Sequence, residues 1–167
     1  MEYDIGQWII ERLSHNLPQF NNLPACPFAK EAWTNNRVQV RELKNNKVNL
    51  SMKEYFICEL ENFSYYWPKD KEVVVLGCSP EYITSEELSS AVDEANLKFL
   101  KNRGFIALED HPSDIESVNG YILNQGTYAL ILLQSSKKLN NARKILEKKN
   151  YYKKWSTEYK DSVLNRS

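Results

Sequence analysis

The sequence predicts one α+β domain, in which helices pack on a mixed sheet of about four strands. Three observations predict this class. The chain has 167 residues, enough for one core, and 42% of them are hydrophobic. Segments with helical spacing alternate with strand-like segments, and the run Val73–Leu76 is apolar and β-branched enough for a buried central strand. A helix between two strands implies a right-handed parallel crossover. We expect a ferredoxin-like arrangement first and an open three-layer sheet second.

Capping signals and apolar spacing predict the helices. Ser51–Glu54 and Thr84–Glu87 have the residue pattern of a capping box. Pro68 ends the first of these two helices, and Gly104 suits the C-terminal end of the second. Apolar residues at helical spacing predict further helices near residues 4–13, 27–34 and 135–146.

Strand patterns occupy four segments between and after the helices. Residues 37–43 alternate between polar and apolar side chains, as in a half-buried strand. The apolar segments 73–76, 105–108 and 128–133 are expected to form the remaining strands, and residues 113–126 a loop with some local structure. We therefore place the domain at residues 1–155, followed by a C-terminal tail over residues 156–167.

Charge and composition exclude several classes of function. The 22 basic and 22 acidic residues cancel, which argues against a nucleic-acid partner held by phosphate contacts. No apolar run approaches the ~18 residues that a membrane span needs, so no membrane association is expected. The acidic start Met1–Asp4 does not resemble a signal peptide, so we expect a cytoplasmic protein with reduced thiols. With two histidines, no zinc site is expected.

Cys26 is the first candidate site residue. It directly precedes Pro27, a residue favoured at the first position of a helix, so Cys26 is expected at the N-cap. The positive end of the helix dipole would then lower the pKa of the thiol and favour the reactive thiolate. The alternative is a small buried hydrophobic residue beneath a proline-rich loop.

His111 is the second candidate, at the end of a predicted strand in the segment Glu109–Pro112. The neighbouring Asp110 is expected to orient the imidazole. If Cys26 and His111 meet, they form the thiolate–imidazolium pair of nucleophilic cysteine catalysis. The alternative is a surface-loop histidine held by the following proline.

Several motifs in order resemble a bacterial family of unknown function, best described as the CPFA-motif family. Cys26–Ala29 match its Cys-Pro-Phe-Ala motif, and His111-Pro112 match its His-Pro motif. A third motif keeps only Asn124 and Tyr128, and Gln125 replaces the family's arginine. The resemblance implies a divergent member with a shared site of Cys26, His111, Asn124 and Tyr128, and it implies no particular reaction.

We therefore expect an enzyme for a small-molecule substrate. Cys26 would be the nucleophile or a ligand, and His111 the acid–base partner oriented by Asp110. The segment with Asn124, Gln125 and Tyr128 would line the substrate pocket. Two alternatives stay open: a metal or haem carrier using Cys26 and His111, and a non-catalytic protein that binds a protein partner or a second copy of itself. The aromatic surface for that binding would comprise Tyr65, Tyr66, Trp67, Tyr151, Tyr152 and Trp155. The sequence identifies no cofactor.

Overall fold

A mixed four-stranded sheet lies at the centre of the structure, a computed structural model that describes residues 1–44 and 50–164. Its strands, in spatial order, are β3 (Val38–Glu42), β4 (Val73–Cys78), β8 (Ala129–Ser135) and β5 (Phe105–Asp110). The first two strands are parallel, and β8 is antiparallel to both of its neighbours. The expected α+β class with a sheet of four strands is confirmed.

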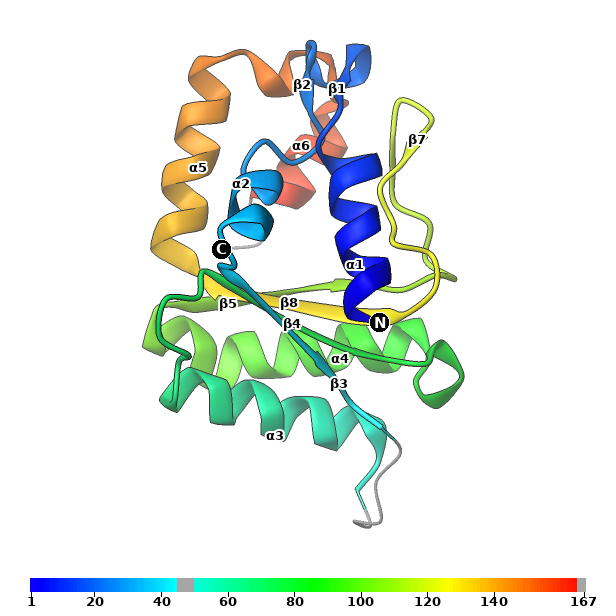
Figure 1. Ribbon diagram of the computed structural model, residues 1–167, viewed down its shortest axis with the longest axis vertical. Coiled ribbons are helices and arrows are strands. Elements are labelled where there is room, and N and C mark those ends of the chain that lie inside the picture. Colours follow the sequence, from blue (N-terminus) through cyan, green and yellow to red (C-terminus); the bar gives the residue numbers. More distant parts are fainter. Residues whose placement is uncertain (45–49, 165–167) are drawn as a thin grey trace.

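Helices cover both faces of this sheet (Figure 1). The first pair, α3 (Met52–Tyr65) and α4 (Ser85–Ala95), lies on one face. The opposite face carries α1 (Glu2–Trp8), α2 (Ala29–Thr34) and α5 (Ser136–Lys148). The ferredoxin-like expectation is wrong, because that arrangement keeps its helices on one face of the sheet. The second expectation, an open three-layer sheet, describes the architecture.

Both predicted capping boxes are present. Ser51 and Thr84 each accept the backbone N–H of the residue at N3, and the N3 glutamates bond back to the capping residues. Beyond α4 the helix continues through a π-helical turn, η4 (Asn96–Leu100), and a 3₁₀ turn, η5 (Lys101–Arg103). It ends at Gly104, which adopts a left-handed conformation with φ of 78°.

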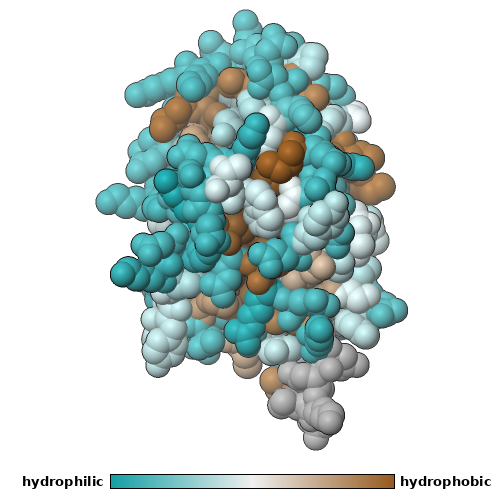
Figure 2. All heavy atoms as spheres, viewed as in Figure 1, coloured by the Kyte–Doolittle hydropathy of each residue, from teal (hydrophilic) through white to brown (hydrophobic). Residues whose placement is uncertain are grey.

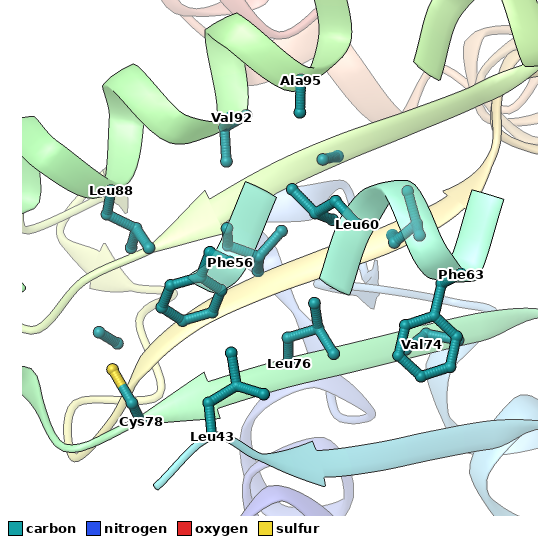
Figure 3. Close-up of a cluster of buried hydrophobic side chains, with 14 of the residues drawn as sticks. Leu43, Phe56, Leu60, Phe63, Val74, Leu76, Cys78, Leu88, Val92 and Ala95 are labelled. Atoms are coloured by element: carbon teal, nitrogen blue, oxygen red, sulfur yellow. The ribbon is translucent and has the colours of Figure 1, made fainter. Parts of the chain in front are cut away.

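The side chains of the central strands point alternately to the two faces of the sheet, so each face has its own part of the hydrophobic core. On β4, the side chains of Val74, Leu76 and Cys78 pack beneath α3 and α4 (Figure 3), whereas Val75 packs towards α1 and α2. Successive side chains of a strand point to opposite faces. The sheet therefore separates side chains that pack beneath α3 and α4 from side chains that pack against α1 and α2.

The local structure expected in the loop is a short hairpin, and the expected tail contains a helix. Residues 113–126 include a short hairpin of β6 (Ser117–Val118) and β7 (Tyr121–Ile122). Residues 157–164 of the expected tail form α6, and Leu164 packs against an aromatic cluster; residues 165–167 lie outside the described residues. The remaining short elements are η1 (Ile9–Leu13), β1 (Asn16–Leu17), η2 (Pro18–Phe20), β2 (Leu23–Pro24), η3 (Pro80–Tyr82) and η6 (Tyr151–Lys154).

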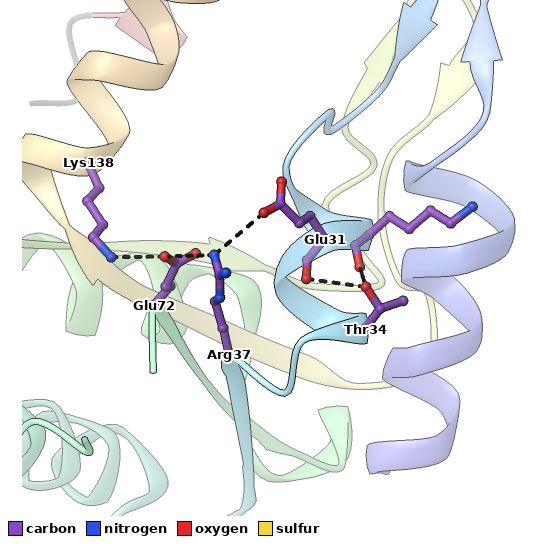
Figure 4. Close-up of polar contacts among 6 residues, drawn as sticks. Glu31, Thr34, Arg37, Glu72 and Lys138 are labelled. Atoms are coloured by element: carbon purple, nitrogen blue, oxygen red, sulfur yellow. Dashed lines mark hydrogen bonds and ion pairs between the residues drawn. The ribbon is translucent and has the colours of Figure 1, made fainter. Parts of the chain in front are cut away.

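An ion-pair network links α2 and α5 to the residues just before β3 and β4, at one end of the sheet (Figure 4). Arg37 lies 3.6 Å from Glu31 of α2 and 3.5 Å from Glu72, and Lys138 of α5 lies 3.0 Å from Glu72. Partly exposed pairs of this kind each contribute about 0–1 kcal/mol, so this network adds little to the stability of the fold. None of the described helices is long and apolar enough to cross a bilayer.

Candidate functional site

Asn124 is the centre of a polar cluster beyond the end of β5. Its side chain is 6% exposed, and its Oδ1 accepts the Glu116 N–H at 2.6 Å. The Nδ2 group donates to Asp110 Oδ1 at 2.7 Å, to the Asp114 carbonyl at 2.9 Å and to the His111 carbonyl at 3.2 Å. One side-chain amide thus holds the Asp110 carboxylate and the backbone of His111, Asp114 and Glu116.

Asp110 and Gln125 complete this cluster. Asp110 Oδ2 accepts the Gln125 N–H at 2.8 Å, and Gln125 Oε1 accepts the N–H groups of Thr127 at 2.8 Å and Tyr128 at 3.0 Å. Burial raises the pKa of Asp110, and the donors from Gln125 and Asn124 oppose that rise. The Gln125 side chain therefore closes a turn that leads into β8.

His111 follows Asp110 and turns to the α4 side of the sheet. The imidazole is 7% exposed, and its Nε2 lies 3.1 Å from the carbonyl of Ile83, a residue in the core beneath α3 and α4. Its Nδ1 lies 2.7 Å from Ser113 Oγ and accepts the Ser113 N–H at 3.2 Å. Both ring nitrogens therefore have hydrogen-bonding partners.

The His111 hollow, as we call it, has a volume of about 370 Å³ and opens beside the first turn of α4. It lies at the carboxyl ends of β4 and β5, which run parallel to each other on either side of β8. Sites in sheets with helical crossovers collect at that edge. The hollow is lined by Pro80, Glu81, Tyr82, Ile83, Thr84, Ser85, Glu86, Glu87, His111 and Ser113.

Negative charge dominates the wall of the His111 hollow. Glu81, Glu86 and Glu87 all line it, and Glu87 is already bonded to the backbone of Thr84. The pKa of Glu86 is lowered, first by its own backbone N–H, then by the hydroxyls of Thr84 and Ser85, and to a smaller extent by His111. Glu86 and Glu87 lie in the first turn of α4, so an external anion would meet negative charge at this helix N-terminus.

Cys26 lies on the opposite side of the sheet. It packs in the cluster formed by α1, η1 and α2 with β3, β4 and β8, and its N–H donates to the Leu13 carbonyl at 2.9 Å. Among the described residues, the contacts of Cys26 and those of His111 have no residue in common. The structure does not bring the two predicted partners together.

Two local expectations for Cys26 are wrong. The N-cap of α2 is Phe28, because Cys26–Ala29 first form a turn closed by the bond from the Ala29 N–H to the Cys26 carbonyl at 3.2 Å. Burial raises the pKa of the Cys26 thiol, although the N–H groups of Phe28 and Ala29 act in the opposite direction. Loss of water around the sulfur outweighs those two donors.

The structure gives Tyr128 and Asp110 contacts other than the expected ones. Tyr128 O–H donates to Asp4 of α1 at 2.8 Å, which holds that ring against the α1 side of the sheet. Asp110 bonds to Asn124 and Gln125 rather than to the imidazole of His111, so the expected direct orientation is wrong. The Ile83 carbonyl and Ser113 orient the ring instead.

Sequence reasoning missed Ser113, Ile83 and Glu86 as parts of the site. A signal was available for Ser113, since a hydroxyl two residues after a histidine can reach the ring across a turn. The position of Ile83 and Glu86 depends on the packing of α4 against β5, which no local pattern reports. Within the described residues, the structure has no group of three or more His, Cys, Asp or Glu side chains that could hold a metal ion.

The six aromatic residues expected on a partner-binding surface divide between surface and core. Tyr65 and Tyr66 are 62% and 77% exposed, whereas Tyr151 and Tyr152 are buried in an aromatic cluster around Phe20. Trp67 and Trp155 are partly buried; Trp67 stacks on Phe105, and Trp155 is tilted against Tyr151. Figure 2 shows one face of the molecule on which polar residues predominate and hydrophobic residues form small separate groups.

We expect Cys58 to be the first thiol that a disulfide reagent modifies at about pH 8. Cys58 is exposed, Cys26 is half-buried with a raised pKa, and burial raises the pKa of Cys78 to about 12. Timed reaction with 5,5′-dithiobis(2-nitrobenzoate) measures the order. The fast phase should vanish in Cys58→Ser and persist in Cys26→Ser; the reverse result would restore Cys26 as a reactive thiol.

Comparison of the chain with family models, with curated proteins and with solved structures found no match. The resemblance to the CPFA-motif family therefore stays a prediction from the motifs alone.

Proposed function

We propose that the protein is an enzyme that acts on a small molecule bound in the His111 hollow, with His111 as the acid–base group. The observation that carries this proposal is the buried imidazole in the wall of that hollow, fixed on both ring nitrogens at the edge where β4 and β5 end. A concave site with a few convergent polar groups is the usual form of a small-molecule site. Histidine is the most common acid–base group near neutral pH.

Cys26 has no part in this proposal. Its thiol packs in the cluster of α1 and α2, whereas His111 bonds to the core on the other face of the sheet. The same separation removes support for a haem or metal ligand pair of Cys26 and His111. A binding protein with an aromatic surface has less support than an enzyme, because Tyr151 and Tyr152 are buried.

The charge of the His111 hollow favours a neutral or cationic ligand. Glu81 and Glu86 present carboxylates to it, and Tyr82, which is 42% exposed, offers the face or edge of a ring. An aromatic ring beside carboxylates is a suitable environment for an organic cation. An anionic ligand would be repelled by these carboxylates.

Nuclear magnetic resonance of the two histidines tests this proposal with a matched set of probes. Benzylamine, benzyl alcohol and benzoate differ in charge and share one ring, and each is titrated at millimolar concentration. We expect the imidazole signals of His111 to shift with the amine and the alcohol more than with benzoate. His15 is exposed at the end of η1 and serves as the internal control, with His15→Asn and His111→Asn assigning the signals. If none of the probes moves His111 more than His15, the proposed function is contradicted.

A further inference from the structure

Ser113 and His111 form a hydrogen-bonded pair at the His111 hollow. Ser113 is exposed, lines the hollow, and places its Oγ 2.7 Å from the Nδ1 of the buried imidazole. An exposed hydroxyl within hydrogen-bonding distance of a fixed imidazole is the spacing at which histidine can take a proton from serine.

The partners of the ring define which nitrogen carries the proton. The Ile83 carbonyl can only accept, so the Nε2 at 3.1 Å must donate. The Ser113 backbone N–H can only donate, so the Nδ1 at 3.2 Å must accept. Both contacts require the same neutral tautomer, with the lone pair of Nδ1 directed at Ser113. The Ile83 carbonyl thus takes the orienting position that a carboxylate occupies in a serine–histidine–aspartate triad.

The backbone of His111 is held independently of its ring. The Asn124 side chain donates to the His111 carbonyl at 3.2 Å and to the Asp114 carbonyl at 2.9 Å, and the Asp114 N–H donates to the His111 carbonyl at 3.1 Å. Ser113 therefore lies in a turn that is tied down at both ends. Such support keeps a reacting pair within the narrow range of geometry that catalysis needs.

We infer that Ser113 is a nucleophile activated by His111, and that the substrates of the His111 hollow are neutral or cationic esters or similarly activated acyl compounds. This inference rests on the proposed function and deepens it. The charge limit follows from Glu81 and Glu86, whose carboxylates line the same hollow.

The reaction proceeds in two balanced steps. In the first, the Ser113 Oγ–H proton passes to His111 Nδ1, Oγ bonds to the acyl carbon, and the bond to the leaving group breaks. The proton on Nδ1 then passes to the leaving group, which departs as an alcohol. In the second step, water loses a proton to Nδ1 and its oxygen bonds to the acyl carbon. The bond between Oγ and the acyl carbon then breaks, the proton on Nδ1 returns to Oγ, and a carboxylic acid leaves. No oxidant or reductant takes part.

Labelling with an uncharged alkyl fluorophosphonate tests the inference by intact-mass measurement and peptide mapping. Attack by Oγ forms a bond to phosphorus and expels fluoride, so each modified chain gains one adduct. We expect one adduct on Ser113 in the wild type and in Ser117→Ala, an exposed serine of β6 used as the matched control, and none in Ser113→Ala. In His111→Asn the labelling rate should fall by about 100-fold or more.

A second variant avoids dependence on the folding of His111→Asn. In a Cys58→Ser background, Ser113→Cys should be alkylated by iodoacetamide about tenfold faster than Ser117→Cys, because the nearby imidazole favours the thiolate. Equal alkylation rates would overturn the inference, as would an absent fluorophosphonate adduct or one on another residue. If these results are negative while benzylamine still shifts His111, the nucleophile is refuted and the proposed function survives. If both tests are negative, both proposals fail.

Discussion

Replacing Asn124 with aspartate is expected to lower the free energy of unfolding by about 3–5 kcal/mol at pH 7, because it buries a second negative charge beside Asp110 with no positive charge to pair with it. The side chain is 6% exposed, and its Nδ2 donates to Asp110 and to two backbone carbonyls. A carboxylate at this position would face those three acceptors with no hydrogen to donate. Asn124→Ala removes the same bonds without adding a charge and should cost less, about 2–3 kcal/mol.

The pH dependence of Asn124→Asp separates charge repulsion from lost hydrogen bonds. Burial already raises the pKa of Asp110, and a second carboxylate beside it raises the pKa of both. A carboxyl group whose pKa is higher in the folded than in the unfolded chain binds its proton more tightly when folded. The variant therefore loses stability relative to wild type as the pH rises from about 4 to 7 and these groups lose their protons. Urea unfolding at both values measures this, with the exposed Asn141→Asp as control. A deficit that is the same at both values would contradict the repulsion.

Replacing Phe56 with alanine is expected to lower the free energy of unfolding by about 3–5 kcal/mol. Phe56 is fully buried on the inner side of α3, where it packs with Leu76, Cys78 and Leu88 between the helices and the sheet (Figure 3). The smaller side chain leaves a cavity that this close-packed layer fills only in part. Urea unfolding measures the loss.

Two comparison variants calibrate the Phe56→Ala result. Phe56→Leu keeps most of the buried volume and should cost about 1–1.5 kcal/mol. Tyr66 lies at the end of the same helix and is 77% exposed, so Tyr66→Ala should change stability by less than about 0.5 kcal/mol. A loss below about 1 kcal/mol in Phe56→Ala would mean that α3 does not pack on the sheet as described.

The elements of the fold could be predicted from the sequence because their signals are local. Ser51 and Thr84 begin α3 and α4 as their capping boxes indicate, and Gly104 ends the helical segment in a left-handed conformation. The order of the strands could not be predicted. β8 pairs with β4 and β5 over their whole length, and such pairing between segments far apart in the sequence leaves no local pattern.

The candidate site was predicted only in part, and the reason differs from residue to residue. Asp110, His111, Asn124 and Gln125 do lie together, because the end of β5 and the start of β8 are adjacent in the sheet. The pKa of the Cys26 thiol was misjudged because α2 begins at Ala29 rather than directly after Cys26, and because Cys26 packs against the apolar cluster of α1, η1 and α2. The dipole argument concerned the helix alone, and burial outweighed it.

The tautomer of His111 is the most direct test of the central claim, which is that a fixed imidazole directs its Nδ1 lone pair at Ser113. Long-range ¹H–¹⁵N correlation spectra of the imidazole distinguish the two neutral forms, and His15 again serves as the internal reference. We predict that, at a pH where the ring is neutral, His111 carries its proton on Nε2 in a slowly exchanging bond to the Ile83 carbonyl. A proton on Nδ1, or rapid averaging between the two nitrogens as in a free histidine, would contradict the account.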